Sequence, residues 1–454
     1  MTHPLRTCLA LLIVGSLLTT LPAQDKPVAP MAAAADPTAP KPLGASVKRG
    51  LDYLVRQQDA SGGWGQGGGW RVGQQGRVEG TELKDPPDVG NTSIAVLALV
   101  RAGNTPKSGA YAKEVARAAD FICNHVQKSD DKSLYVTDIK GTQIQSKIGP
   151  YVDTFLASMV LAELKGKMAD EKGDQMLLAA LTKTVSKIEK NQQADGTFKG
   201  NEGWATVLSQ GLANKGLNRA AQNGVAVQVA SLNRIQSQVA GNYDAKTRDF
   251  KSASPANPPG DNYSNNKNAR ASGRAGSQPV PQMPTAPSDA GVPIYNASSN
   301  LTNAADVTNT LRLQEKMAKQ ILADKNASKE AKKIAEDTVL RCSEAEKLCE
   351  DATQAVLKRL DQPEFVQGFG SNGGEEFLSY MNISEALLLK GGADWKKWDK
   401  SMSESLTRIQ DRDGSWSGHH CITGRTFCTA TALLVLMADR APVTATHKNE
   451  AVSK

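Results

Sequence analysis

The sequence has 454 residues, of which 39% are hydrophobic and only 5% aromatic, and its net charge at pH 7 is +7. Lys and Arg are interleaved with Asp and Glu along stretches of helical spacing, so they form no basic stripe, and this argues against a nucleic-acid partner. The length is compatible with several domains or with one domain built from repeats.

The first residues have the composition of an export signal. Residues 9–21 are an uncharged, mostly apolar run that follows Arg6, and the small residue Ala23 comes soon after it. This arrangement predicts a signal peptide over residues 1–23. The run is shorter than the about 20 apolar residues of a membrane span, although a retained anchor is the alternative. We expect an exported protein (periplasmic, in the cell envelope or secreted) that is not an integral membrane protein.

After a Pro- and Ala-rich linker over residues 24–44, amphipathic helices alternate with more apolar helices as far as residue 440. The predicted pairs are 45–58 with 91–100, 110–126 with 151–164, 181–193 with 204–212, 225–240 with 304–322, 345–360 with 377–389, and 402–410 with 427–437. Residues 251–300 are rich in Pro, Asn, Ser and Gly and predict a disordered insertion within the fourth pair. Residues 441–454 predict a flexible tail. Recurrence every 45 to 60 residues or so indicates a repeat array or a closed ring.

Three turns share one pattern: QQDASGGWG (57–65), QQADGTFKG (192–200) and QDRDGSWSG (410–418). These turns resemble the repeats of squalene and hopene cyclases. The apolar helices that follow them are similar to the inner helices of the terpenoid cyclase and protein prenyltransferase superfamily, with its prenyltransferase/squalene oxidase repeats. The resemblance covers residues 45–440 and implies an all-α fold, an α/α toroid of six helical hairpins with an inner and an outer ring. Five aromatic residues fall in turns or at helix starts, where we expect them to wedge successive repeats together: Trp64, Trp70, Trp204, Trp416 and Tyr151.

The chemistry of that superfamily does not carry over with its fold. The Asp-x-Asp-Asp motif of the cyclases is absent, and the nearest string, Asp411 to Gly414, lies in a repeat turn. Prenyltransferase β-subunits hold zinc with Asp, Cys and His at the starts of inner helices. Cys428 falls where the helix with that His would be, but no Asp-x-Cys pair precedes it. The resemblance therefore implies a central cavity for an isoprenoid, lipid or peptide ligand and leaves catalysis open.

Several polar residues are predicted to meet at one mouth of that cavity. Superimposing the apolar patterns of the inner helices places these residues at equivalent helix starts: Asn91, Asp153, Ala205, Asn382 and Cys428, with Tyr151 beside Asp153. Helix N-termini favour anions and lower the pKa of a thiol. Capping of their own helices is the alternative role for Asn and Asp. Residues Gln143, Gln145 and Lys147, in a long polar connection, could reach over this mouth.

The densest cluster of reactive residues is the segment 418–428, for which three interpretations stay open. Cys421 and Cys428 could form a disulfide, which an exported protein permits. A metal such as zinc could be bound by a set drawn from His419, His420, Cys421, Cys428 and Asp153. Cys428 could instead be a catalytic nucleophile, with a histidine such as His420 as base, Asp153 nearby and Arg425 binding an anionic group.

Two functions from different classes follow. In the first, the exported toroid binds a hydrophobic ligand or a peptide in its cavity near Cys428 and Asp153. In the second, it is a non-catalytic scaffold of the cell envelope or a protein-interaction module.

Overall fold

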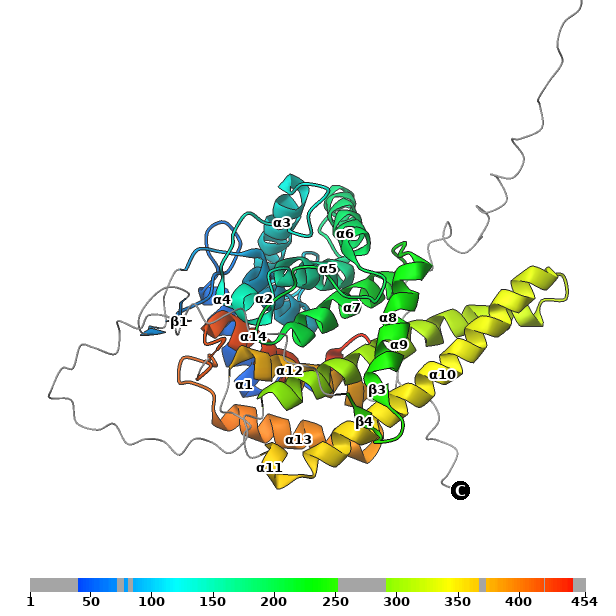
Figure 1. Cartoon of the computed structure of the whole chain (residues 1–454). Helices are drawn as coiled ribbons and strands as arrows, with labels where there is room; N and C mark the ends of the chain where they lie inside the picture. The colour runs from blue at the N-terminus through cyan, green and yellow to red at the C-terminus, as the bar shows by residue number, and fades with distance from the viewer. Residues whose placement is uncertain are drawn as a thin grey trace, which may run out of the picture.

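The computed structural model describes residues 40–71, 77–80, 85–251, 291–366, 373–419 and 421–443, and these are mainly α-helical (Figure 1). The all-α class is therefore confirmed. Within these ranges, the strands form two short antiparallel pairs, β1 (Gly69–Trp70) with β2 (Arg77–Val78) and β3 (Tyr243–Asp244) with β4 (Asp249–Phe250). The predicted signal peptide, nearly all of the linker and most of the tail lie outside the described residues.

Six helices form the interior: α2 (Val89–Arg101), α5 (Val152–Leu164), α7 (Thr206–Gln222), α9 (Gly291–Ala323), α12 (Gly374–Lys390) and α14 (Arg425–Leu436). Every residue of α2 and α5 is buried, as expected for helices that are covered on all sides. Each of these helices packs on the next: α2 packs on α5, α5 on α7, α7 on α9, α9 on α12 and α12 on α14. The last, α14, packs on the first, α2. In the described ranges, no helix is both long and apolar enough to cross a membrane.

The amphipathic helices lie outside these six: α1 (Ala45–Arg56), α3 (Ala112–Lys128), α6 (Glu171–Asn191), α8 (Val229–Asn242), α10 (Lys329–Leu360) and α13 (Gly392–Arg408). Each packs on at least one interior helix, for example α3 on α2, α6 on α5 and α10 on α9. In helix α3, for example, apolar side chains recur every three or four residues. They therefore lie on one face of the helix, and only that face is buried. Two short helices, α4 (Gln143–Ile148) and α11 (Pro363–Val366), and a 3₁₀ turn (Ala438–Arg440) complete the described part of the fold.

The three turns with the shared pattern have one geometry. A glycine with positive φ stands at the same place in each: 92° at Gly62, 85° at Gly196 and 95° at Gly414. The backbone N–H of the residue three before the glycine donates to the carbonyl of the residue after it, at 2.9, 2.8 and 2.9 Å respectively. Only glycine adopts this left-handed conformation without a steric cost, so the glycines fix the turns.

The tryptophans of the first and third turns join each outer helix to the interior helix that follows. Trp64 is fully buried; its Nε1 donates to the carbonyl of Leu54 at 2.7 Å, and its backbone N–H donates to Thr92 Oγ1 at 2.8 Å. Trp416 makes the same two contacts with the equivalent leucine and threonine, at 2.9 and 3.0 Å. The prediction that aromatic residues wedge the repeats together is thus confirmed for Trp64 and Trp416, but not for Trp70 and Trp204, which are 39% and 52% exposed.

The prediction of disorder over 251–300 is wrong for its last ten residues, because α9 begins at Gly291 and not near residue 304. The buried part of this helix is rich in Asn and Ser, so the spacing of apolar residues does not indicate a helix there. Asn300 is 2% exposed and donates from Nδ2 to the Asn296 carbonyl at 2.9 Å, while Asn242 donates to its Oδ1 at 2.9 Å. Residues 252–290 lie outside the described part. Helix α10 also begins earlier than predicted, and with α9 it forms a long hairpin that projects from the body (Figure 1).

Candidate functional site

Cys428 lies in the first turn of α14 as predicted, but it is fully buried. Its Sγ donates to the carbonyl of Ile422 at 3.3 Å. Burial, and then the negative charge of Glu375, raises the pKa of the Cys428 thiol far above its ordinary value. Because the thiolate is the reactive form, burial disfavours the nucleophile interpretation of Cys428: desolvation opposes the effect of the helix N-terminus on the pKa of this thiol.

The predicted metal ligands do not come together in the described part of the chain. No three or more His, Cys, Asp or Glu side chains there lie close enough to hold a metal ion. His419 is exposed at the surface, whereas Asp153 and Cys428 are buried. His420 lies outside the described residues. Cys421 and Cys428 are not joined by a disulfide either.

Arg425 is directed to the neighbouring turn. Its Nη1 lies 2.6 Å from Asp411 Oδ2 and donates to Ser415 Oγ at 2.7 Å. Glu79 lies 3.6 Å from its Nη2. Its charge is thus already neutralised by carboxylates, and the expectation that Arg425 binds an anionic ligand is not supported by these contacts.

Asp153 and Asp88 form a buried pair of carboxyls where α2 and α5 begin. Asp153 Oδ1 accepts the backbone N–H of Gly90 at 2.9 Å, and Asp88 caps α2 by accepting the backbone N–H of Asn91 at 2.7 Å. Burial, followed by repulsion from Asp153, raises the pKa of Asp88 to about 7; burial also raises the pKa of Asp153. Helix capping, the alternative role for such residues, is therefore observed. Asp88 caps α2, and Asp153 of α5 accepts a backbone hydrogen bond from the start of the neighbouring helix α2.

The other predicted mouth residues have mixed outcomes. Asn91 is buried beside Asp88, to which its Nδ2 donates at 2.8 Å. Tyr151 directly precedes α5, and its hydroxyl donates to the Lys199 carbonyl at 3.1 Å. Asn382 was placed wrongly: α12 begins at Gly374, so Asn382 lies midway along it.

Glu375, which the sequence reasoning missed, occupies the start of α12. Its Oε2 accepts the backbone N–H of Ile422 at 3.1 Å, and burial raises its pKa to about 7. Acidic residues at a helix start are usually exposed and interact with the helix dipole, so the sequence offers only a weak signal, two glutamates directly before an apolar run.

Helix α4 covers the starts of several interior helices, as predicted for this connection. Gln145 donates to Asp153 Oδ2 at 2.7 Å, and the Lys147 carbonyl accepts the backbone N–H of Ala205 at 2.8 Å. Gln143 reaches the segment before α14, where its Oε1 accepts the backbone N–H of Thr423 at 3.0 Å. The buried carboxyls therefore lie beneath a helix that is held by side-chain hydrogen bonds.

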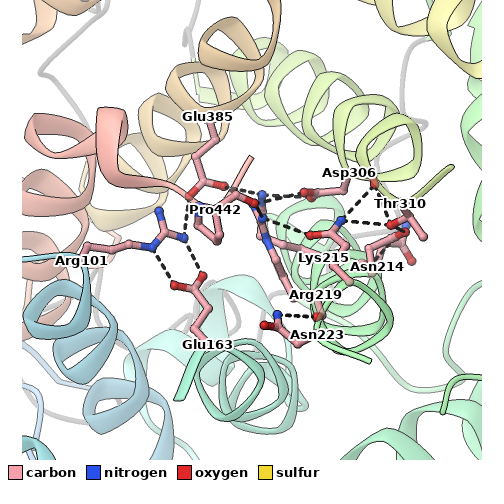
Figure 2. Close-up of polar contacts among 12 residues, drawn as sticks. Arg101, Glu163, Asn214, Lys215, Arg219, Asn223, Asp306, Thr310, Glu385 and Pro442 are labelled. Carbon is pink, nitrogen blue, oxygen red and sulfur yellow. Dashed lines mark hydrogen bonds and ion pairs between the residues drawn. The ribbon is translucent and has the colours of Figure 1, made fainter. Parts of the chain in front are cut away.

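At the other end of the interior helices, six ionisable side chains form one buried network (Figure 2). Three are basic and three acidic, and none is more than 5% exposed. Five helices contribute them: Arg101 from α2, Glu163 from α5, Lys215 and Arg219 from α7, Asp306 from α9 and Glu385 from α12.

Several side chains of this network each pair with more than one opposite charge. Glu385 lies 3.1 Å from Arg101, 2.7 Å from Lys215 and 3.3 Å from Arg219. Arg101 also lies 2.6 Å from Glu163, and Lys215 lies 3.0 Å from Asp306. Although burial acts to raise it, the three cations lower the pKa of Glu385 far below its ordinary value. The charges balance, which buried ions require.

No protein family model matches the sequence, and no similar protein is found among curated proteins.

Proposed function

We propose that this protein is an α/α toroid that acts as a non-catalytic scaffold, binding partners on its outer surface. The toroid is supported by the order of the helix contacts, in which the last interior helix packs on the first. It is also supported by the turn after α13, where Gln410 is bound by Arg49 of α1. The resemblance of the three turns to cyclase repeats favours the same architecture. Because of the predicted signal peptide, we place this scaffold outside the cytoplasm.

The observation that carries the scaffold proposal is the buried network between Arg101, Glu163, Lys215, Arg219, Asp306 and Glu385. A toroid that binds a hydrophobic ligand in its centre needs apolar lining there. In this protein, charged side chains from five interior helices meet at one end of the interior and form ion pairs with one another. Bringing an isoprenoid into that space would break ion pairs that have no access to water, which is costly.

Ligand-dependent thermal stability tests this proposal. A ligand that binds only the folded state at about 100 times its Kd raises the free energy of unfolding by about 2.7 kcal/mol. We expect farnesyl diphosphate, geranylgeranyl diphosphate and a long-chain polyprenol to leave the midpoint of thermal unfolding unchanged. Native mass spectrometry of the purified full chain should detect no co-purified isoprenoid. A saturable stabilisation by any of these compounds would contradict the scaffold proposal and favour a cavity ligand.

A second candidate function has one specific observation in its favour. Asp88 and Glu375, both beneath or beside α4, have pKa values raised to about 7, in the range of a general acid at neutral pH. If α4 opens, these carboxyls become accessible to a ligand at the mouth. Hydrogen exchange tests this, because a ligand bound there would slow exchange across α4, and the Asp88→Asn variant would lose any proton-transfer activity while keeping the cap.

A further inference from the structure

The projecting hairpin of α9 and α10 exposes large apolar side chains. Exposure is 42% at Met317, 38% at Ile321, 47% at Ile334 and 58% at Leu340. The two helices are packed together through other, small residues, for example Ala335, which are buried. The exposed apolar residues are therefore not needed to hold the hairpin together. Met317 and Ile321 lie in the last two turns of α9 and Ile334 in the first two turns of α10, next to the loop at the end of the projecting hairpin (Figure 1).

The same end is rich in lysine. Residues 316–333 contain six lysines against two acidic residues, Asp324 and Glu330, while Glu315, Glu336 and Asp337 flank this segment and Glu315 pairs with Lys319 at 2.8 Å. Met317 and Ile321 are four residues apart on α9 and so share one helix face. Lysines that surround exposed aliphatic side chains at the end of a projecting element are typical of segments that lie in a membrane interface.

We propose that this tip, residues 316–334, binds the surface of an anionic lipid bilayer. The lysines would lie among the acidic headgroups, and Met317, Ile321 and Ile334 would enter the boundary between headgroups and acyl chains. Since the hairpin projects, its tip can reach a flat surface before the body of the protein touches it. This inference goes beyond the scaffold role and does not depend on what occupies the centre.

The charge of the tip favours a bilayer over two other occupants. In a symmetric contact with a second copy, the same lysine-rich surfaces would face each other and repel. A soluble polyanion would satisfy the lysines but offer no apolar phase for the isoleucines and the methionine.

Vesicle flotation with the purified full chain tests the proposal. We expect binding to phosphatidylcholine vesicles that contain phosphatidylglycerol, weakening as salt is added, and little binding to phosphatidylcholine alone. Two variants should each lower the partition coefficient about tenfold or more: Ile321→Ser with Ile334→Ser, which removes apolar contacts, and Lys325→Glu with Lys329→Glu, which reverses charge.

Control substitutions on the outer helices α3 and α6 test whether vesicle binding depends on the tip or only on the overall charge of the protein. Leu178→Ser changes an equally exposed apolar side chain, and Lys113→Glu with Lys172→Glu gives the same change in net charge. These controls should bind vesicles like the unchanged protein. Equal loss in the controls, equal binding to neutral vesicles, or no binding would overturn the proposal. So would self-association, measured by sedimentation, that the isoleucine substitutions abolish in protein that does not bind vesicles.

Discussion

Gln410 is bound by Arg49, although 361 positions separate them in the chain. The Gln410 side chain also donates to the Ser46 carbonyl at 2.9 Å, so the turn after α13 is fastened to α1. The turn after α1 is fastened to α3 in the same way, with Gln58 bound by Arg117. The turn after the last outer helix, α13, is thus bound to the first outer helix, α1, as the proposed closed ring requires.

Removing this contact should weaken the closure. We expect Gln410→Ala to lower the free energy of unfolding by about 1–2 kcal/mol, because its backbone partners in the turn and in α1 lose their hydrogen bonds. Urea denaturation followed by circular dichroism measures it. Gln175→Ala, at an exposed position of α6, should change stability by less than about 0.5 kcal/mol. Equal effects of the two substitutions would show that Gln410 does not fasten the ends.

Trp416→Ala should be among the most destabilising substitutions. The indole is fully buried and donates to the Leu406 carbonyl, so its loss leaves both a cavity and an unpaired acceptor. We expect a loss of about 3–5 kcal/mol in urea denaturation. Trp204→Ala is the matched control, since Trp204 is 52% exposed, and it should be nearly neutral. A mild effect at Trp416 would contradict its role in joining the repeats.

Glu385→Gln should destabilise the protein by about 3–5 kcal/mol, because Arg101, Lys215 and Arg219 then share too few buried carboxylates. Adding Lys215→Met restores the charge balance, so the double variant should lose less than the two single losses summed. Glu350→Gln, in an exposed pair with Lys390, should cost about 0–1 kcal/mol. Additive losses at positions 215 and 385 would show that the two residues do not interact.

Because Glu385 is ion-paired in the buried network, the free energy of unfolding should also decrease at acidic pH. The folded-state pKa of Glu385 lies below its unfolded value of about 4.3. Its contribution is therefore present above that value and is lost as pH falls through the folded pKa. Thermal unfolding between neutral pH and pH 3 should show this loss, and it should be smaller in the Glu385→Gln variant.

Asp88 should have the opposite effect on pH dependence. Its pKa is raised to about 7, so between about pH 4 and 7 the folded state binds more protons than the unfolded state. Stability from this group therefore decreases as pH rises through that window. Asp88→Asn keeps a capping side chain and should flatten the slope, while Asp361→Asn at the surface should not. An unchanged slope would mean that Asp88 titrates as an exposed carboxyl.

Cys428 should be inert in the folded protein. Because its thiol is buried and its pKa is strongly raised, iodoacetamide should leave it unmodified at neutral pH and modify it once the protein is unfolded in urea. Peptide mass spectrometry reads out the modified position. Rapid modification of the native protein would restore the nucleophile hypothesis.

Some of the site was predictable from local pattern. The polar connection before α5 was expected to cover the starts of the interior helices, and Gln145 indeed binds Asp153. The error at Asn382 arose because apolar spacing sets the face of a helix but not where it begins. The start of α9 was missed since its buried residues are Asn and Ser, whose partners come from other helices.

The sequence by itself determined the helical class, the pairing of amphipathic with apolar helices and the three glycine turns, because each follows from residues close together in the chain. Only the tertiary structure decided which charged residues are buried. Arg101, Glu163 and Glu385 lie in largely apolar helices, and their buried charges are balanced only because the fold brings distant helices together. In the same way, the pKa of the Cys428 thiol is raised by burial, although the residue lies at the start of a helix.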